Sequence, residues 1–194
     1  MEDKIIPINE KNGRWFILER TIKYENKYGL KLYEDKVKRP DGKEGLYGWV
    51  EIGGGVNILP IDNNDNIYLG KDFMYPIGAE SIEVASGGIE SGETPLDAAK
   101  RELKEELGVT ANEWIDMGIY RPITGRVRSI QYMYIVRGID LGESKQDSTE
   151  NIKLIKMPLE EAVKKVMNNE IQEGLTSTLI LKAYVLFGKR KNGK

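Results

Sequence analysis

The sequence of 194 residues predicts an α/β protein in which helices cover a mixed sheet and a strand-rich extension comes first. Three observations predict this class. The length corresponds to about 1.3 domains of roughly 150 residues each, which favours one well-filled domain with an appendage. Residues 1–55 contain extended apolar runs separated by turn residues. After residue 80, short strands alternate with segments of helical spacing, which is typical of a layered α/β domain.

The N-terminal strands are expected between turn signals. Pro40-Asp41-Gly42 predicts one turn, and Asn63-Asn64-Asp65-Asn66 predicts another. The strands expected around these turns span residues 15–24, 29–37, 46–52, 56–61 and 67–71. They are expected to form a meander or small sheet that continues into a larger fold.

A helix is predicted over residues 95–107 because both of its ends carry clear signals. Thr94 is a good N-cap, Pro95 suits the first helical position, and Gly108 ends the helix. A short strand over 81–85 and a loop over 86–92 are expected before it. The elements expected after it are strands over 115–120, 130–136 and 152–157, an acidic loop over 142–151, and helices over 158–167 and 176–187.

The composition excludes several classes of chemistry. The chain contains no Cys and no His, which removes thiolate nucleophiles, Ser-His-Asp triads and the usual zinc sites. The 29 basic and 31 acidic residues give a net charge of -2, so we expect no nucleic-acid partner. No apolar run approaches the length of a membrane span, and the N-terminus lacks the apolar segment of a signal peptide. We therefore expect a cytoplasmic protein without a membrane partner.

Three carboxylates are expected on one face of the predicted helix. Glu102, Glu105 and Glu106 have i, i+3 and i+4 spacing, so they repel one another. They also lie near the C-terminal end of the helix, where its dipole disfavours negative charge. A divalent cation would reverse this effect, and oxygen ligands alone suit Mg²⁺, Mn²⁺ or Ca²⁺. The alternative is a solvated acidic face, neutralised by its basic neighbours Lys100, Arg101 and Lys104.

The loop before this helix favours a binding site. Gly87, Gly88 and Gly92 allow the backbone to come close to a ligand or a metal. Glu93 and Arg101 could form an ion pair that ties the loop to the helix.

These residues together form a motif that resembles the Nudix box. The motif reads Gly87-x5-Glu93-x7-Arg101-Glu102-Leu103-x-Glu105-Glu106-x-Gly108-Val109. The resemblance implies an α/β/α sandwich over residues 56–194 and an enzyme that hydrolyses the pyrophosphate of a nucleoside diphosphate linked to another group. It also implies a divalent cofactor, Mg²⁺ or Mn²⁺.

The resemblance implies a role for each residue of the motif. The metal ligands it implies are the main-chain oxygen of Ser86 and the carboxylates of Glu102, Glu105 and Glu106. Glu105 is either a ligand or a group that orients water, and so counts as a candidate catalytic residue. The residues it implies as structural are Gly87, Glu93, Arg101 and Gly108.

The flanking segments resemble the ADP-ribose and nucleotide-sugar pyrophosphatases of this family. That group has a strand-rich extension, which implies that residues 1–55 build a homodimer. Three segments depart from its pattern, and one of them is Val84-Ala85-Ser86, which stands where Leu-Pro-Ala is more common. Met74 stands about where an Arg is common, and Arg126-Val127-Arg128 stands where a Glu is common. These departures leave room for another nucleotide sugar, such as GDP-mannose.

Further residues are candidates for catalysis and substrate binding. The acidic loop resembles one that often supplies the base, so Glu150 is the first candidate, with Glu143 and Asp147 behind it. The alternative for these acids is solvation without a role. The candidates for binding phosphate or stacking on a base are Arg39, Arg126, Arg128, Trp49, Tyr28 and Tyr47. The alternative for them is a place on the surface, in the core or in a dimer interface.

The function that follows is metal-dependent hydrolysis of ADP-ribose or a related nucleoside diphosphate sugar, a small-molecule substrate. The products would be a nucleoside monophosphate and a sugar phosphate. Two alternatives remain: a Nudix module that senses a nucleotide without cutting it, and a hydrolase that removes damaged nucleoside triphosphates.

Overall fold

The computed structural model describes residues 4–146 and 151–188. The chain falls into two compact units. The N-terminal unit comprises the residues up to Gly54 together with Arg121–Ile130, and the sandwich unit comprises Gly55–Tyr120 together with the residues from Gln131 onward. The boundary expected at residue 55 leaves Arg121–Ile130 out of the first unit. A single boundary in the sequence cannot describe a unit that also contains a segment from much later in the chain.

The N-terminal unit is built on one five-stranded sheet. Its strands lie in the order β1 (Lys4–Asn12), β2 (Trp15–Glu25), β3 (Lys31–Lys38), β4 (Glu44–Glu51) and β10 (Val127–Arg128). The first four form an antiparallel meander, and β10 pairs with β4 in parallel. The strands predicted over 15–24, 29–37 and 46–52 belong to this meander, whereas those predicted over 56–61 and 67–71 belong to the sheets of the sandwich unit. The sequence did not predict β1 or β10. Pro7 and the polar residues of β1 obscure its alternation, and two residues are too few for a pattern in β10.

The sandwich unit contains two sheets. The first has the order β8 (Ala85–Gly88), β5 (Gly55–Pro60), β11 (Gln131–Leu141) and β9 (Val109–Tyr120), with β5 and β11 parallel and the other pairs antiparallel. The second has the antiparallel order β12 (Lys153–Pro158), β6 (Asn66–Met74) and β7 (Ala79–Glu83). The mixed sheet that the sequence predicts is therefore present.

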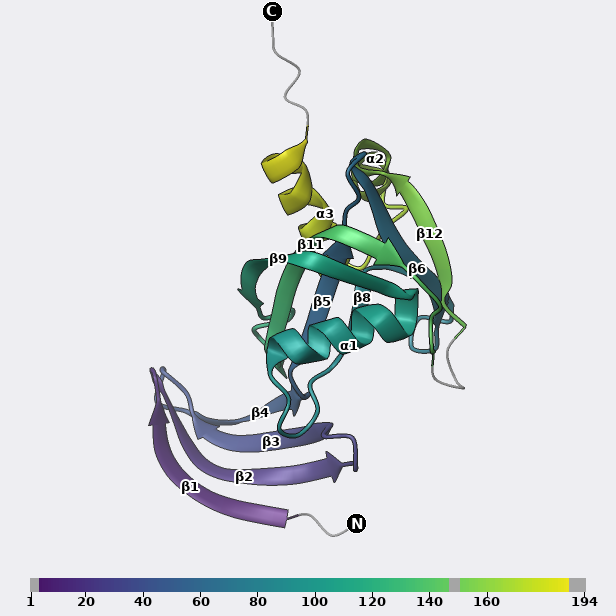
Figure 1. The fold of residues 1–194 in the computed structure, drawn as a ribbon. Coiled ribbons are helices and arrows are strands. Elements are labelled where there is room, and N and C mark those ends of the chain that lie inside the picture. Colours follow the sequence, from purple (N-terminus) through teal and green to yellow (C-terminus); the bar gives the residue numbers. More distant parts are fainter. Residues whose placement is uncertain (1–3, 147–150, 189–194) are drawn as a thin grey trace, which may run out of the picture. The chain divides into compact units, whose positions relative to one another are not determined.

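Helices cover the first sheet on both faces. The helix α1 (Pro95–Leu107) lies across β5 and β8 (Figure 1), and α3 (Gly174–Phe187) contacts β5 and β11 of the same sheet. The helix α2 (Leu159–Met167) packs against α3 and contacts β6 and β12 of the second sheet. The buried strand β5 divides its side chains between two cores. Val56 and Ile58 pack in the cluster that includes α1, whereas Leu59 packs in the cluster that includes α2 and α3. This division confirms the α/β/α layering.

Several boundaries differ from the prediction: β9 begins at Val109 and not at 115, β11 ends at Leu141 and not at 136, and β6 ends at Met74 and not at 71. Two further differences concern β8 and α3. The strand predicted over 81–85 is two strands, and Ser86–Gly88, predicted as loop, extends β8. Ser86 and Gly87 lie opposite Asn57 and Val56 of β5, so backbone pairing holds a segment whose glycines give no side-chain pattern. The helix α3 starts two residues before the predicted start because Glu173 accepts hydrogen bonds from the Leu175 and Thr176 amides.

The predicted turn at Asn63–Asn66 is organised by Asp62. The Asp62 carboxylate accepts from the Asn64 amide at 2.8 Å, the Asn66 amide at 2.9 Å and Lys156 Nζ of β12 at 2.8 Å. Its side chain is 14% exposed. Burial by itself raises the pKa of Asp62, but the hydrogen bonds from Lys156 and Asn66 outweigh it and hold the pKa below its usual value. The Asp62 carboxylate therefore connects the turn to β12.

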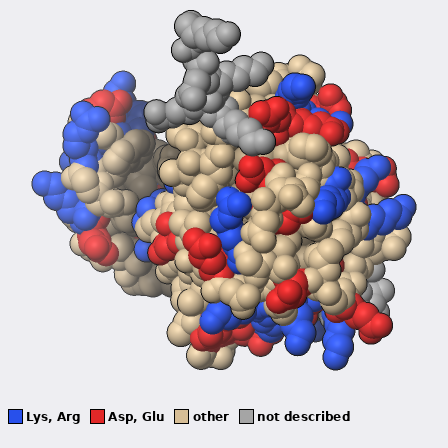
Figure 2. Space-filling model, turned by 45° about the horizontal axis from the view of Figure 1, so that its top comes forward, with Lys and Arg blue, Asp and Glu red and all other residues tan. Residues whose placement is uncertain are grey.

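The surface carries both signs of charge. Basic and acidic side chains are interspersed over the face shown in Figure 2, in keeping with a net charge of -2. Within residues 4–146 and 151–188, no helix combines the length and the apolar character that a membrane span requires.

Candidate active site

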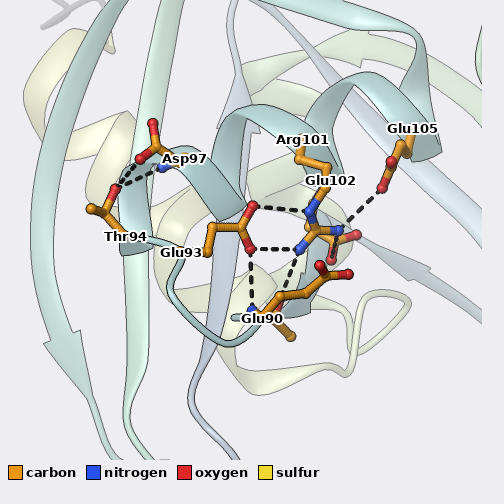
Figure 3. A network of polar contacts seen from close by, with 8 residues as sticks. Glu90, Glu93, Thr94, Asp97, Arg101, Glu102 and Glu105 are labelled. Atoms are coloured by element: carbon orange, nitrogen blue, oxygen red, sulfur yellow. Dashed lines mark hydrogen bonds and ion pairs between the residues drawn. The ribbon is translucent and has the colours of Figure 1, made fainter.

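The first turn of α1 is fixed by local contacts. Thr94 Oγ1 accepts a hydrogen bond from the Asp97 amide at 3.2 Å and donates one to the Asp97 carboxylate at 2.6 Å (Figure 3). Pro95 occupies the first helical position, where its missing N–H costs nothing. These contacts satisfy amides that a helix N-terminus otherwise leaves without partners.

The helix turns an apolar stripe inward and its acidic residues away from it. Ala98, Ala99, Leu103 and Leu107 are buried in the core against β5 and β8. Burial of this stripe fixes the rotation of the helix about its axis. The rotation in turn decides where Glu102, Glu105 and Glu106 lie.

Arg101 lies at the centre of a polar network. Its Nε and Nη2 donate to the two oxygens of Glu93, each at 3.0 Å, and Nη2 also donates to the Gly88 carbonyl at 2.9 Å (Figure 3). The ion pair expected between Glu93 and Arg101 is therefore present and has two-point geometry. It joins the loop before α1 to the body of the helix. The Arg101 guanidinium also holds the pKa of the Glu93 carboxyl below its usual value.

Arg101 also contacts two of the three grouped carboxylates. Its Nη1 donates to Glu102 at 2.7 Å and to Glu105 at 3.1 Å. The Glu102 side chain is 14% exposed, whereas that of Glu105 is 44% exposed. Part of the repulsion between the acids is thus offset from within the helix, by one of the three basic neighbours that the sequence indicates. The other two, Lys100 and Lys104, are exposed.

The third carboxylate is tied to the neighbouring strand. Glu106 accepts a hydrogen bond from the Ser86 amide at 2.9 Å. The next residue, Gly87, leaves the space in which the Glu102 carboxylate lies, because a Cβ at this position would overlap that group. The start of the motif on β8 and its end on α1 therefore meet at Ser86, Gly87, Glu102 and Glu106.

The C-terminal end of α1 is closed by glycine. Gly108 has a left-handed φ of 65°, and its amide donates to the Leu103 and Lys104 carbonyls. A Cβ on Gly108 would lie 2.5 Å from the Gly142 carbonyl oxygen and 2.8 Å from the Ser144 nitrogen. Two separate constraints, backbone conformation and close approach of residues 142–144, therefore require glycine here.

The N-terminal unit contains a separate groove of about 710 Å³. Of the predicted substrate-binding residues, Tyr47, Trp49, Arg126 and Arg128 line it. Arg39 does not line it, and its guanidinium pairs locally with Asp41 at 3.4 Å. Tyr28, which is 81% exposed, does not line it either.

Two arginines of this groove lie beside aromatic rings. The Arg126 guanidinium lies 5.0 Å from the Tyr47 ring centroid, and Arg126 Nη1 donates to the Gly48 carbonyl at 3.0 Å. The Arg128 guanidinium lies 5.9 Å from the Trp49 ring and 3.4 Å from Glu51. Aromatic rings and guanidinium groups thus line the same groove.

Several residues of the groove were not predicted from the sequence, among them Trp15, Arg20 and Asp35. Trp15 packs edge-on against Tyr47, with ring centroids 5.6 Å apart. Arg20 binds the buried Asp35 through two bonds of 2.7 and 2.9 Å, and Trp49 Nε1 donates to the same carboxylate at 3.1 Å. Arg20 and Asp35 are cross-strand partners of β2 and β3, so the register of the predicted hairpin could have revealed this pair.

A comparison with family models matches the NUDIX domain over residues 52–178. The match covers more than half of the chain and contains the whole motif. The chain belongs to the Nudix hydrolase family.

Similar proteins agree with the Nudix assignment. The chain is 29% identical to an ADP-ribose pyrophosphatase of Bacillus subtilis (strain 168) over 167 residues, which cover 84% of this chain and 90% of that protein. It is also 29% identical to a methanol dehydrogenase activator of Bacillus methanolicus over 165 residues, 81% of this chain and 88% of that protein. Because two relatives at the same identity carry different names, the names do not fix the substrate.

A solved structure supports the fold. The crystal structure of an ADP compounds hydrolase matches with a TM-score of 0.79 at 17% identity, and the match covers 93% of this chain and 99% of that one. At this identity the likeness concerns the Nudix fold and not the substrate.

The donor set suits a hard divalent cation. The carboxylates of Glu102, Glu105 and Glu106 and the Ser86 carbonyl are all oxygen ligands, which Mg²⁺ and Mn²⁺ prefer. As the side chains stand, Arg101 engages two of these acids, and residues 4–146 and 151–188 hold no ready-made cluster of three metal-binding side chains. The chemistry of the donors therefore fits a divalent cation.

Only some of the candidate general bases lie within the part of the chain that the structure describes. Glu150 and Asp147 lie outside the described residues. Glu143 is exposed beside the Gly108 end of α1. Glu105, the other predicted catalytic residue, lies on α1 within the Arg101 network.

Proposed function

We propose that the chain hydrolyses the pyrophosphate bond of ADP-ribose or a related nucleoside diphosphate sugar with the help of Mg²⁺ or Mn²⁺. The products are a nucleoside monophosphate and a sugar phosphate. The observation that carries the proposal is the meeting of the acids of α1 with the Ser86–Gly87 backbone, through the bond from the Ser86 amide to Glu106. The relative named as an ADP-ribose pyrophosphatase supports this choice of substrate.

The residues of the motif divide the work of binding and orienting. Glu102, Glu106 and the Ser86 carbonyl hold the cation, with Glu105 as a further ligand or as the group that orients water. The cation, when bound, neutralises phosphate charge in the ground and transition states and makes water easier to deprotonate. Glu93 holds Arg101 in place through the two-point ion pair.

A general base completes the proposed reaction. The chain has no His, so a carboxylate has to accept the proton of the attacking water if the cation does not suffice. We propose Glu150 for this role on the strength of the family resemblance, with Glu105 as the alternative within α1.

The groove of the N-terminal unit is proposed to bind the nucleoside part of the substrate. Tyr47 and Trp49 offer ring faces for stacking on a base, and Arg126 and Arg128 offer paired donors for phosphate. The same unit is proposed to form a homodimer, and the enzyme is proposed to act in the cytoplasm on small nucleotides. Nucleic acid and membranes are not proposed as partners.

Product analysis tests the activity. The protein is incubated with Mg²⁺, and separately with Mn²⁺, and a panel that contains ADP-ribose, GDP-mannose, UDP-glucose and nucleoside triphosphates, and the products are identified by mass. AMP and ribose 5-phosphate are expected from ADP-ribose. Preference for GDP-mannose keeps the chemistry and changes the substrate. Stoichiometric binding without product would indicate a nucleotide-sensing module and overturn the proposal.

A charge-removing variant tests the site. Glu106→Gln keeps an oxygen that can accept from the Ser86 amide but removes the negative charge. If the cation supplies a few kcal/mol of charge stabilisation, turnover falls by about 10²-fold or more. Glu113→Gln, at an exposed position on β9, is the matched control and keeps its activity. Unchanged turnover in Glu106→Gln would refute the assignment of the site.

A further inference from the structure

The segment 142–146 closes over the C-terminal end of α1. The Gly142 amide donates to the Gly108 carbonyl at 2.7 Å, and the Lys145 amide donates to the Glu105 carbonyl at 2.9 Å. A helix leaves its last carbonyls without partners, so these bonds satisfy groups that the helix itself cannot. The segment therefore acts as a cap supplied from a distant part of the chain.

Gln146 extends this cap with its side chain. Gln146 Nε2 donates to the Glu106 carbonyl at 3.1 Å and to the Ile152 carbonyl at 2.8 Å. Gln146 Oε1 accepts from the Ile152 amide at 2.9 Å. One carboxamide thus joins the last turn of α1 to the start of the segment that leads into β12.

The bonded carbonyls belong to residues that carry the proposed site. Lys145 and Gln146 hold the backbone of Glu105 and Glu106, two consecutive residues whose carboxylates are proposed metal ligands. The ends of a helix fray most easily, and negative side chains near its C-terminal end destabilise the last turn further. A shift of about 1 Å in a catalytic group can cost about 10²-fold in rate. A bond that fixes this turn therefore affects the chemistry without touching the substrate.

We propose that Gln146 is a positioning residue, which holds the Glu105–Glu106 turn in the geometry that the cation requires. This inference rests on the proposed function for its kinetic consequences. Gln146 carries donors and an acceptor in one planar group, and all three bonds use that combination. Glutamate at this position lacks donors for the two carbonyls, and leucine lacks both donors and acceptor.

The test compares Gln146→Leu and Gln146→Glu with the wild type and with Gln172→Leu. Gln172 is a matched control because it is exposed and its Nε2 makes one bond, to the Asn169 carbonyl in the loop before α3. Circular dichroism and melting temperature establish that each variant is folded. The kinetic probe is ADP-ribose at a series of Mg²⁺ concentrations.

Both Gln146 variants are expected to lose about tenfold or more in kcat, with KM for ADP-ribose within about twofold of the wild type. The Mg²⁺ concentration that gives half-maximal rate is expected to rise severalfold, and excess Mg²⁺ is expected to restore part of kcat. A role in stability alone would lower the melting temperature and leave this Mg²⁺ dependence unchanged. The Gln172→Leu variant is expected to match the wild type in all three quantities.

A readout without turnover separates this inference from the proposed function. Mg²⁺ or Mn²⁺ alone is titrated while the melting temperature is followed, because a ligand that binds the folded state stabilises it. The wild type is expected to gain stability at lower metal concentration than the Gln146 variants. Wild-type protein that gains stability at lower metal concentration than the Gln146 variants but cuts no nucleoside diphosphate sugar of the panel would refute the proposed function and leave the positioning role supported. Gln146 variants with wild-type metal stabilisation and wild-type Mg²⁺ dependence would overturn the positioning role.

Discussion

The substitution Gly87→Ala separates the geometry of the site from the stability of the fold. Gly87 does not have a left-handed φ, so alanine fits its backbone conformation. The added methyl group would overlap the Glu102 carboxylate, which is the far end of a flexible side chain. The carboxylate can therefore move away, and little strain passes into the backbone.

The size of the movement follows from van der Waals distances. Carbon contacts lie at about 3.5–4.0 Å, so the Glu102 carboxylate has to retreat by roughly 1–2 Å. A misplacement of about 1 Å in a catalytic group costs about 10²-fold in rate. Turnover of Gly87→Ala is therefore expected to fall by about 10²-fold or more. The free energy of unfolding is expected to change by less than about 1 kcal/mol, as for a substitution that meets only a movable side chain.

The neighbouring glycine provides the control. A Cβ on Gly88 meets no atom within 4 Å, so Gly88→Ala is expected to keep both activity and stability. The assay measures product formation from ADP-ribose under saturating Mg²⁺, together with thermal unfolding of both variants. Wild-type turnover in Gly87→Ala would show that the position of the Glu102 carboxylate does not limit the reaction. Equal losses in both variants would show that the effect comes from the backbone of β8 and not from Glu102.

Three further predictions follow from the same structure. Gly108 combines a left-handed φ with close backbone approach, so Gly108→Ala is expected to lower the free energy of unfolding by about 2–3 kcal/mol and the melting temperature by about 5–10 °C. Gly92 has a φ of 86° and open space around it, so Gly92→Ala is expected to lower the free energy of unfolding by about 1–2 kcal/mol. Equal losses in the two variants would exclude the close approach as a cause. Because the pKa of Asp62 is lowered on folding, its contribution to stability is present above its unfolded pKa of about 3.9 and is lost as pH falls through the folded pKa. Asp62→Asn is therefore expected to lose about 1–2 kcal/mol at neutral pH in urea unfolding and to show a flatter acid limb, and an unchanged acid limb would contradict this. Tyr47→Ala is expected to raise KM for ADP-ribose about 5- to 30-fold with little change in kcat. Tyr28 is exposed and does not line the groove, so Tyr28→Ala is expected to leave KM unchanged. Equal KM values for the two variants would show that the groove does not bind the substrate.

The helix of the site could be predicted from the sequence because its signals are local. Thr94, Pro95 and Gly108 mark its ends within the chain itself, and the structure has the helix over the predicted residues. The pairing of Glu93 with Arg101 also follows from spacing, since the two residues flank the first turns of the helix. Signals that lie within about fifteen residues of one another need no knowledge of the fold.

The contacts that come from far along the chain could not be predicted in this way. The Ser86–Gly88 strand depends on pairing with β5, and its glycines carry no side-chain pattern that indicates a strand. Segment Arg121–Ile130 joins the N-terminal sheet through a two-residue strand. Both contacts are backbone hydrogen bonds between distant segments, which periodicity does not report.

The acidic turn of α1 is the place where these two kinds of information combine. Carboxylates at the C-terminal end of a helix are unfavourable, and Arg101 of the same helix offsets part of this cost through its bonds to Glu102 and Glu105. Further support comes from outside the helix: Glu93 holds Arg101, the Ser86 amide holds Glu106, and Gln146 holds the Glu106 backbone. The geometry of the acids is therefore a property of β8, the motif loop and segment 142–146 as much as of the helix. A sequence motif names the acids, but substitutions at these supporting positions should alter their use without altering the motif.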